Sequence, residues 1–364
     1  MANTLRGALI GYGFIGERGH LPAYLQRDTG RPDSDFVITA IADVSEARRE
    51  LARRAVPHAR IYEDARSLLA AEANRIDFVD IATPPCDHAA IAHLALSRGL
   101  HVLCEKPLAT SAHDAQAMLD HAVQAKRVLF PGHNYKHAPV IRAVRQVLDS
   151  GRLGAIHLVT LDTFRTTHAK GVPEWMPDWR RVRRYSGGGI AMDHGSHTFY
   201  LAFDWLKSYP LSITAKMSHL AAFDTEDNFS CTLTFPTGIA TAQLTWNAGM
   251  RKVIYTLHGE RGAVKIEDDD VQIVVKAQGA LSPEVETLSI ASDWMDASHV
   301  GWFRSLLDQF GQAIEAHDYA GTEAREAYLC VKLIETAYAS ARSGSRELPL
   351  VATQDVAGLA SASR

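Results

Sequence analysis

Short apolar runs alternate with helix-compatible segments over residues 1–130. Each run stops near a glycine, proline or aspartate, the residues that most often end strands. This alternation is typical of a parallel sheet covered by helices. The predicted strands are Ala8–Ile10, Phe36–Ala42, Phe78–Ala82, His101–Cys104 and Val128–Phe130, and the predicted helices are Ser45–Ala55, Asp87–Arg98 and His113–Lys126.

The pattern changes after Phe130. Helices are predicted at Pro139–Asp149 and Asp193–Leu206, and a long β-rich stretch follows. Its strands flank two turn signals and favour an open antiparallel sheet with one packed face. Two amphipathic helices close the pattern. These strands are Phe229–Phe235, Ile239–Trp246, Val253–His258, Ala263–Glu267 and Val271–Lys276, and the closing helices are Trp302–Ala316 and Thr322–Ala341.

The two patterns predict two domains, since 364 residues are many for one core. We expect an α/β domain over residues 1–130, a doubly wound parallel sheet of the Rossmann type. Residues 131–350 should form an α+β domain, with a large open, mostly antiparallel sheet flanked by helices. Residues 351–364 are predicted to be a tail of lower complexity.

Composition narrows the partners. The formal net charge of −4 argues against a nucleic-acid or anionic-membrane surface. No apolar stretch reaches the roughly 18–20 residues of a membrane helix. The four cysteines show no CxxC spacing, which indicates reduced thiols. With no signal-peptide pattern at the N-terminus, these features predict a cytoplasmic protein.

A glycine-rich turn follows the first predicted strand. Gly11, Gly13 and Gly16 have the GxGxxG spacing and enclose Phe14 and Ile15. The glycines permit a tight turn and let backbone N–H groups approach a pyrophosphate at a helix N-terminus. A chance glycine turn is the alternative, but the position directly after an apolar strand favours a dinucleotide site.

Asp43 ends the second predicted strand, where a carboxylate would bind the adenine ribose hydroxyls. It lies further from Gly11 than usual, and we place the excess in a loop insertion at Asp28–Asp35. A carboxylate repels a 2′-phosphate, so we expect NAD rather than NADP. Arg48 and Arg49 keep NADP open, and Asp43 is equally suited to capping the next helix.

Two further segments end strands at the same predicted sheet edge. Thr83 and Pro84 follow the third strand, where ligands bind in open α/β sheets. His88, at the start of the next helix, either faces the cofactor or is solvated. Glu105 and Lys106 follow the fourth strand, and Pro107 gives the lysine a fixed direction. Lys106 is therefore a candidate catalytic group beside the nicotinamide, although strand-end lysines are often plain surface residues.

Asp193 and His197 are four residues apart and share one face of a predicted helix. A carboxylate can orient an imidazole, which makes His197 a candidate general acid or base. A satisfied core pair and a metal site with His194 are the alternatives. Because neighbouring helical residues diverge by about 100°, we expect Asp193 and His194 not to share an ion, and we predict no metal.

Together these motifs resemble the Gfo/Idh/MocA oxidoreductase family, which includes glucose–fructose oxidoreductase and myo-inositol dehydrogenase. The resemblance covers nearly the whole chain. The segment Arg18-Gly19-His20 is unusual for the family, and Lys136 stands where an arginine is common. The shared motifs are Gly11–Gly16, Thr83-Pro84-Pro85, Glu105-Lys106-Pro107, Trp179-Arg180, Gly187-Gly188-Gly189, Asp193-x-x-x-His197 and Gly259-x-x-Gly262.

The resemblance implies hydride transfer between nicotinamide and a secondary alcohol or ketone of a sugar, polyol or cyclitol. It implies that Lys106, Asp193 and His197 carry the catalysis, and that the open sheet joins subunits in a homodimer or homotetramer. Glu105 and Lys106 would also contact the cofactor.

Aromatic and arginine side chains ahead of the glycine run suit a sugar, because rings stack on sugar faces and guanidinium groups bind hydroxyls. We expect Arg165, Trp179, Arg180 and Asp193 to bind substrate, although loop packing explains each almost as well. Competing functions are an NAD-dependent glycosidase with transient oxidation, a non-catalytic NAD-binding regulator and a metal-dependent hydrolase.

Overall fold

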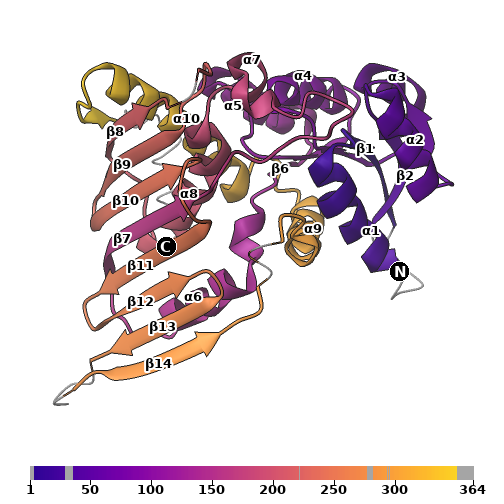
Figure 1. The fold of residues 1–364 in the computed structure, drawn as a ribbon. Coiled ribbons are helices and arrows are strands. Elements are labelled where there is room, and N and C mark those ends of the chain that lie inside the picture. Colours follow the sequence, from indigo (N-terminus) through magenta and orange to yellow (C-terminus); the bar gives the residue numbers. More distant parts are fainter. Residues whose placement is uncertain are drawn as a thin grey trace. The chain divides into compact units, whose positions relative to one another are not determined.

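The chain forms two compact units in a computed structural model (Figure 1). The structure describes residues 4–28, 36–220, 222–276, 282–292, 294 and 296–350. The chain passes between the units more than once. The first unit comprises Met1–Asn134, Ala169–Gly187 and Asp296–Val331, and the second comprises Tyr135–His168, Gly188–Met295 and Lys332–Arg364.

A six-stranded parallel sheet forms the centre of the first unit, with the order β3-β2-β1-β4-β5-β6. This is the strand order of a dinucleotide-binding doubly wound sheet, which confirms the predicted Rossmann domain. Its strands are β1 (Leu5–Ile10), β2 (Phe36–Ala42), β3 (Arg60–Tyr62), β4 (Phe78–Ile81), β5 (His101–Cys104) and β6 (Leu129–Pro131).

Helices of the first unit follow the strands in alternation. The glycine turn leads into a π-helical segment, η1, which is continuous with α1. The α-helix α10 begins in this unit and ends in the second. These elements are η1 (Gly16–His20), α1 (Leu21–Asp28), α2 (Glu46–Ala55), α3 (Ala65–Glu72), α4 (Pro85–Leu96), α5 (Ala112–Ala125), η3 (Trp179–Arg181), α7 (Arg183–Ser186), α9 (Val300–Glu315) and α10 (Thr322–Arg342).

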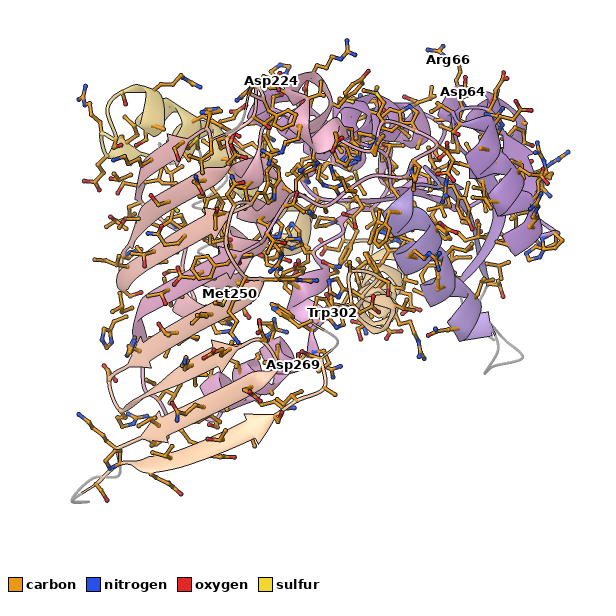
Figure 2. All side chains as sticks on the ribbon, in the orientation of Figure 1. Asp64, Arg66, Asp224, Met250, Asp269 and Trp302 are labelled. Carbon is orange, nitrogen blue, oxygen red and sulfur yellow. The ribbon has the colours of Figure 1, made fainter. Side chains whose placement is uncertain are left out.

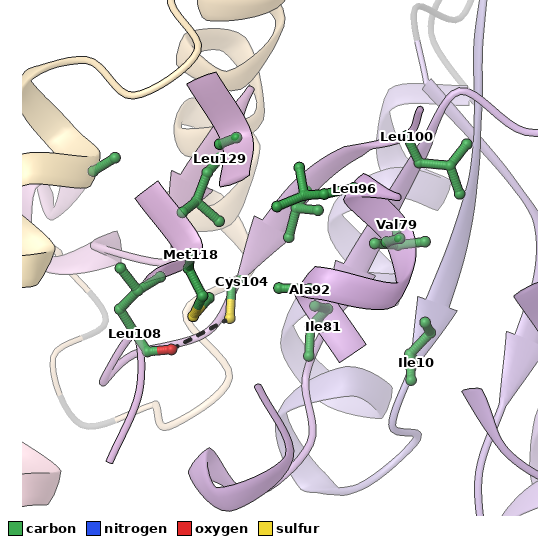
Figure 3. Packing of buried hydrophobic residues seen from close by; sticks show 14 of the residues in the cluster. Ile10, Val79, Ile81, Ala92, Leu96, Leu100, Cys104, Leu108, Met118 and Leu129 are labelled. Carbon is green, nitrogen blue, oxygen red and sulfur yellow. Dashed lines mark hydrogen bonds between the residues drawn. The ribbon is translucent and has the colours of Figure 1, made fainter. Parts of the chain in front are cut away.

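Residues of the parallel strands enter cores on both faces of this sheet. On β1, Ala8 and Ile10 belong to one buried cluster, whereas Leu9 belongs to the other. The first cluster includes Val79 and Met118 (Figure 3). Burial on both faces explains why these strands are continuous apolar runs.

The second cluster depends on α9. Phe303 and Phe310 are buried, and the Phe310 ring stacks on Phe36 with centroids 5.9 Å apart and meets Phe78 edge-on at 5.7 Å. Such aromatic pairs add about 0.5–1.5 kcal/mol each beyond their area burial. A helix far along the sequence therefore completes the N-terminal core.

The start of α3 is fixed by a capping box. Asp64, labelled in Figure 2, accepts a hydrogen bond from the backbone N–H of Ser67 at 2.7 Å, and the Ser67 hydroxyl lies near the Asp64 amide. This reciprocal arrangement satisfies amides that a helix start leaves without partners. The pattern of apolar runs did not predict α3 or β3, which are both short.

The second unit contains a nine-stranded sheet with the order β14-β13-β12-β11-β7-β10-β9-β8-β15. Neighbouring strands are antiparallel except β7 and β10, which are parallel, so the predicted open, mostly antiparallel sheet is confirmed. Its strands are β7 (Ile156–Phe164), β8 (Ser212–Ser218), β9 (Asn228–Phe235), β10 (Gly238–Thr245), β11 (Lys252–Gly259), β12 (Gly262–Glu267), β13 (Asp270–Val275), β14 (Glu284–Ser289) and β15 (Leu348–Pro349).

One face of this sheet is packed. Helix α8 (Ile190–Leu206) contacts β7, β9 and β10, and α6 (Pro139–Asp149) contacts β13. A short helix, η2 (Asn134–His137), precedes α6. Buried residues alternate with more exposed ones along β9, β10 and β11. That alternation is expected of a sheet with one buried face, and in the described residues of Figure 1 the other face carries no helix.

The strand and helix predictions are largely confirmed, within a few residues at most ends. The predicted loop insertion at Asp28–Asp35 and the tail after residue 350 fall almost wholly outside the described residues. Within the described ranges, none of the helices has the length and apolar character needed to span a bilayer.

Candidate active site

The glycine turn is tightly constrained at two of its three positions. Gly11 has a φ of 96°, and a Cβ there would lie 2.7 Å from the Ala82 carbonyl group. A Cβ on Gly16 would lie 2.3 Å from the Gly11 oxygen. By contrast, a Cβ on Gly13 would meet nothing within 4 Å. The backbone at Gly13 therefore borders open space with no side chain in between. A pyrophosphate site requires such close access to the backbone.

The residues between these glycines mark the start of the helical segment. Phe14 is 42% exposed, and Ile15 is half-buried and packs against the second core cluster. The amide of Glu17 donates to the Gly13 carbonyl at 2.9 Å, so the turn passes directly into a helix. A helix N-terminus at this point favours an anionic ligand.

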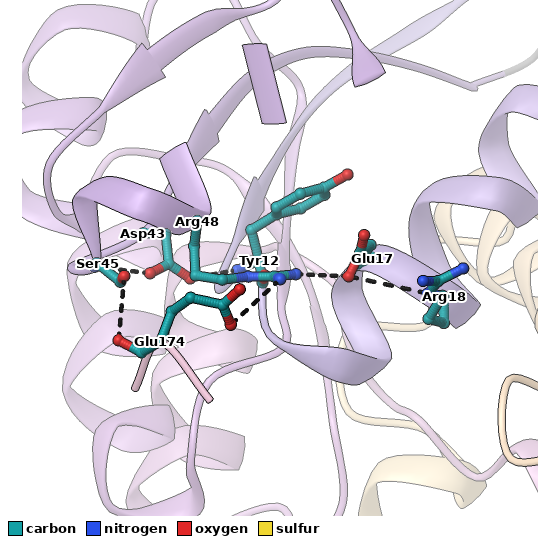
Figure 4. A network of polar contacts seen from close by, with 7 residues as sticks. All are labelled: Tyr12, Glu17, Arg18, Asp43, Ser45, Arg48 and Glu174. Atoms are coloured by element: carbon teal, nitrogen blue, oxygen red, sulfur yellow. Dashed lines mark hydrogen bonds and ion pairs between the residues drawn. The ribbon is translucent and has the colours of Figure 1, made fainter. Parts of the chain in front are cut away.

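The Asp43 carboxylate is held by two backbone amides (Figure 4). Oδ2 accepts from the amide of Tyr12 at 2.7 Å and Oδ1 from that of Ser45 at 2.8 Å. Burial raises the pKa of Asp43, while these two hydrogen bonds oppose the shift. The helix cap position of α2 is occupied by Ser45 rather than Asp43. Asp43 thus ties the end of β2 to the glycine turn.

The two nearby arginines are engaged by protein groups. Arg48 is buried, donates from Nε to the Tyr12 carbonyl at 2.7 Å and pairs with Glu17 at 2.7 Å. A second carboxylate, Glu174, lies 3.7 Å from Arg48 (Figure 4). Arg49 donates to the Asp43 and Val44 carbonyls. These contacts direct both guanidinium groups toward protein acceptors.

Thr83 and Pro84 lie between β4 and α4, with Pro84 at the cap position of the helix. His88 is fully buried, not solvated; its ring nitrogens face the carbonyl oxygens of Thr83 at 2.9 Å and Pro107 at 3.0 Å. Burial lowers the pKa of His88. A neutral imidazole has one N–H, so it donates to only one of these carbonyls at a time. His88 links two segments at the carboxyl edge of the sheet.

Glu105 and Lys106 follow β5 at that same edge. Glu105 is buried, and its Oε2 accepts from the backbone amide of Lys106 at 3.1 Å. Lys106 is half-buried, and its peptide bond to Pro107 is cis. A Cβ on Gly132 would lie 2.9 Å from Glu105 Oε1, so glycine there leaves room for the carboxylate. The glutamate side chain thus holds the backbone that carries Lys106.

The Asp193 and His197 pair belongs to α8 in the second unit. Asp193 Oδ2 lies 3.2 Å from His194 Nδ1, and both side chains are largely buried. The expected divergence of neighbouring helical residues therefore does not keep these two side chains apart, because their rotamers bring the polar ends together. The described residues contain no group of three or more His, Cys, Asp or Glu side chains arranged to hold a metal ion.

His197 is buried in an aromatic setting. Its Nδ1 lies 2.5 Å from Tyr200 Oη, and its ring stacks on Tyr135 with centroids 3.7 Å apart. Tyr200 Oη also accepts from the amide of Tyr135 at 3.2 Å. A tyrosine that the sequence motif did not indicate therefore orients the His197 ring.

Glu226 secures the start of α8 and was missed by the sequence analysis. This fully buried carboxylate accepts from the amides of Gly189 at 2.9 Å and Ala191 at 3.0 Å, and from the Tyr338 hydroxyl at 2.8 Å. A Cβ on Gly189 would lie 2.0 Å from the Glu226 carbonyl oxygen. The glycine run thus allows close approach of this glutamate. No local motif announces a partner so distant in sequence.

The proposed substrate residues are divided between the units. Arg165 follows β7 in the second unit, and its amide donates to Thr245 at 2.9 Å. Trp179 and Arg180 lie in η3 of the first unit. The Arg180 guanidinium lies over the Trp179 ring at 4.2 Å and donates to the Ala169 carbonyl at 3.1 Å. The first unit also holds Lys106 and the glycine turn, and the second holds Asp193 and His197.

Comparison with known proteins decides the family. Residues 5–133 match the oxidoreductase family with an NAD-binding Rossmann fold, and residues 141–265 match the GFO/IDH/MocA C-terminal domain. The chain is 30% identical to inositol 2-dehydrogenase of Rhizobium meliloti (strain 1021) over 275 residues, which cover 73% of this chain and 76% of that protein. The chain belongs to the Gfo/Idh/MocA oxidoreductases.

Other members show how far the likeness extends. A D-apiose dehydrogenase of Paraburkholderia graminis is 36% identical over 149 residues, which cover 41% of this chain and only 37% of that protein. Levoglucosan dehydrogenase, solved with NADH and levoglucosan, matches with a TM-score of 0.83 over 96% of this chain and 100% of that one, at 22% identity. At that identity the structural match supports the fold.

The residues of the first unit fit the cofactor of this Gfo/Idh/MocA fold. The open space beside Gly13 suits a pyrophosphate, and the helical segment that follows offers its N-terminus. Asp43 retains carboxylate lone pairs beyond its two amide contacts and stands at the end of β2, where ribose hydroxyls bind. The first unit is the NAD-binding domain of an oxidoreductase.

Proposed function

We propose that this oxidoreductase transfers a hydride between NAD and a secondary alcohol or ketone of a sugar, polyol or cyclitol. The observation that carries the proposal is the placement of Lys106 directly after β5 of a Rossmann sheet, on backbone held by Glu105. In such sheets ligands bind outside the carboxyl ends of the strands. Lys106 is therefore a cation at the edge where the nicotinamide and the reacting oxygen belong.

Bound nicotinamide would supply the hydride acceptor or donor. In the direction of oxidation, His197 would take the hydroxyl proton, and Lys106 would hydrogen-bond the reacting oxygen and stabilise its developing charge. Donation from His197 Nδ1–H to Tyr200 Oη would leave the basic lone pair on Nε2. Tyr200 contributes to the orientation of the ring, and Asp193 would orient His197 or contact a substrate hydroxyl.

The contacts around Asp43 favour NAD over NADP. A 2′-phosphate would meet the Asp43 carboxylate, with Glu174 nearby, and the guanidinium of Arg48 is directed to Tyr12, Glu17 and Glu174. An anion brought close to these carboxylates is repelled. We expect the ratio of kcat/KM for NAD to that for NADP to exceed about 10, and Asp43→Ser to reduce it.

The substrate class follows the names of the relatives, which act on inositol, apiose, levoglucosan and glucosides. Arg165, Trp179 and Arg180 are the proposed contacts for its hydroxyl groups. We further propose a cytoplasmic homo-oligomer, a homodimer or homotetramer, because the nine-stranded sheet keeps partly exposed apolar side chains such as Leu158 and Ile239.

The proposal is tested by following the absorbance of reduced nicotinamide. Purified protein is mixed with NAD or NADP and, in turn, with cyclitols, anhydrosugars, pentoses, glucosides and the matching ketones with NADH. Turnover of one substrate should fall at least about 100-fold in Lys106→Met and His197→Ala. Lys276→Met, a change at an exposed lysine, should leave turnover unchanged.

Wild-type rates in Lys106→Met and His197→Ala would contradict the proposed roles. Binding of NAD with no net change in absorbance across both directions would instead indicate a redox-neutral glycosidase or a regulator. Faster turnover with NADP than with NAD would contradict the cofactor assignment.

A further inference from the structure

A buried histidine lies between two carboxylates, one of which is Glu105, the residue before Lys106. His20 is the last residue of η1 and is 2% exposed. Its Nδ1 lies 2.7 Å from Asp80 Oδ2 in the middle of β4, and its Nε2 lies 3.1 Å from Glu105 Oε1 after β5. The three side chains come from three separate elements of the first unit. No sequence motif predicted this set.

The contacts define the charge of His20. Ionised carboxylates only accept hydrogen bonds, so both ring nitrogens must donate, and only the imidazolium has two N–H groups. Burial alone disfavours that cation, but Asp80 and Glu105 outweigh it and raise the pKa of His20 to about 10. His20 and Lys106 together keep the pKa of buried Glu105 below its usual range. The cluster is thus built from paired charges.

The surroundings give His20 a single position. The Tyr24 hydroxyl donates to Asp80 Oδ2 at 2.9 Å, and the Phe303 ring lies over the imidazole with centroids 4.2 Å apart. A Cβ on Gly19 would lie 2.8 Å from Phe303, so glycine at this position lets α9 approach the ring. His20 ends the π-helical segment Gly16–His20, and such segments are frequent at functional sites.

The link from His20 to Lys106 is short. Glu105 uses Oε1 for His20 and Oε2 for the backbone amide of Lys106, while its own amide donates to Ile81 on β4 at 2.9 Å. One carboxylate therefore joins the imidazolium to the residue that carries the lysine. We propose that His20 is a positioning residue, which fixes the Glu105 carboxylate and, through it, the turn that presents Lys106.

Loss of the imidazolium has a defined consequence. Without it, Glu105 loses a cation that lowers its pKa and still has a second buried carboxylate, Asp80, in the same cluster. Glu105 then takes up a proton at a higher pH than in the wild type, and a carboxylic acid holds the Lys106 amide less firmly than a carboxylate. Lys106 and His88 still act on Glu105 electrostatically, and Tyr24 still donates to Asp80.

The kinetic test is a double-variant cycle of His20→Gln, Glu105→Gln and both together. This test rests on the proposed dehydrogenase function. We expect the kcat of His20→Gln to be about 10- to 100-fold lower than that of the wild type, with the KM for NAD within about twofold of the wild-type value. The double variant should be no slower than Glu105→Gln, because His20 acts through Glu105. His113→Gln, at an exposed histidine, is the matched control.

Independent effects that multiply in the double variant would overturn the proposal. So would a His20→Gln enzyme with wild-type kcat, or one in which only the KM for NAD changes.

NMR spectroscopy tests the same proposal without any turnover. In histidine-labelled wild-type protein at about pH 8.5, both ring nitrogens of His20 should carry protons. The His20 signals are identified as those that are missing from the spectrum of His20→Gln. The Lys106 amide should show no inflection between about pH 5 and 8 in the wild type and a clear one in His20→Gln. A neutral His20, or a Lys106 amide with the same pH response in both proteins, would overturn the proposal even if no substrate is found.

Discussion

Two buried glutamates, one in each unit, support a proposed catalytic side chain by different means. Glu105 holds the backbone of Lys106 and is balanced by a buried imidazolium. Glu226 holds the start of the helix that carries Asp193 and His197, and it accepts hydrogen bonds from two backbone amides and a tyrosine hydroxyl. Both carboxylates are largely or fully removed from solvent.

The two arrangements differ in how they depend on pH. A buried carboxylate needs hydrogen-bond donors or an opposite charge to remain ionised. Three donors to Glu226 are the backbone amides of Gly189 and Ala191 and the Tyr338 hydroxyl, which are uncharged N–H and O–H groups. The support of Glu105 depends on a proton on His20. We infer that the backbone at Lys106 responds to alkaline conditions through His20, whereas the three hydrogen bonds to Glu226 at the start of α8 come from uncharged donors.

The largest expected effect comes from Glu226→Ala. The change removes the carboxylate that accepts three hydrogen bonds. The buried N–H groups of Gly189 and Ala191 at the start of α8 then lose this acceptor. We expect a loss of about 4 kcal/mol in the free energy of unfolding, seen as a clear drop of the melting temperature in differential scanning calorimetry. The loss should be similar at pH 6.5 and 9.

Glu284→Ala, at an exposed glutamate in β14 of the same unit, is the control and should leave the melting temperature within about 1 °C. A loss for Glu226→Ala that disappears at one end of the pH range would mean that its partners titrate after all.

The pH dependence that His20 confers is an effect of comparable size. The pKa of His20 rises from 6.5 to about 10 on folding, so its stabilisation is complete below pH 6.5 and is lost as the pH rises through about 10. The decline between these limits is about 1.4 kcal/mol per pH unit. Melting curves of wild type and His20→Gln should therefore lie far apart at pH 7 and converge by about pH 10.5. A constant gap would show that His20 contributes only packing.

The smallest expected effects come from the removal of one tyrosine hydroxyl in each unit. Tyr338 donates to Glu226 at 2.8 Å, and Tyr24 donates to Asp80 at 2.9 Å. Each phenylalanine replacement should cost about 1.5 kcal/mol, measured by denaturant unfolding. Tyr24→Phe should leave the kcat nearly unchanged, since Tyr24 stands at the far end of the His20 network from Lys106. A larger effect of Tyr24→Phe than of His20→Gln on turnover would reverse that order.

Much of the fold was predictable because its strands are followed by residues that commonly end strands. Phe36–Ala42 stops at Asp43 and His101–Cys104 at Glu105, and both strands have the predicted bounds. The three-residue β3 is too short for any period to register. The parallel pairing of β7 with β10 depends on long-range contacts that local pattern does not encode.

The site was predictable where function imposes a fixed spacing, as in the glycine turn. The supporting residues were not. Glu226 meets Gly189 from a distant part of the chain, and the π-helical winding before α1 has no local signature. A signal for the cluster existed in Asp80, a charged residue inside an otherwise apolar strand. Such a residue requires a buried partner, but the sequence does not say that the partner is His20.

The path of the chain has a consequence for biosynthesis. The aromatic core around Phe36 and Phe78 is closed by Phe310 of α9, which the ribosome makes long after β6. At roughly 5–20 residues per second, the nascent nucleotide-binding fold waits on the order of ten seconds or more for that helix. During this interval the sheet exposes an apolar face, which makes the emerging polypeptide a natural client for chaperones and makes a gene truncated near Asn134 a poor source of folded protein.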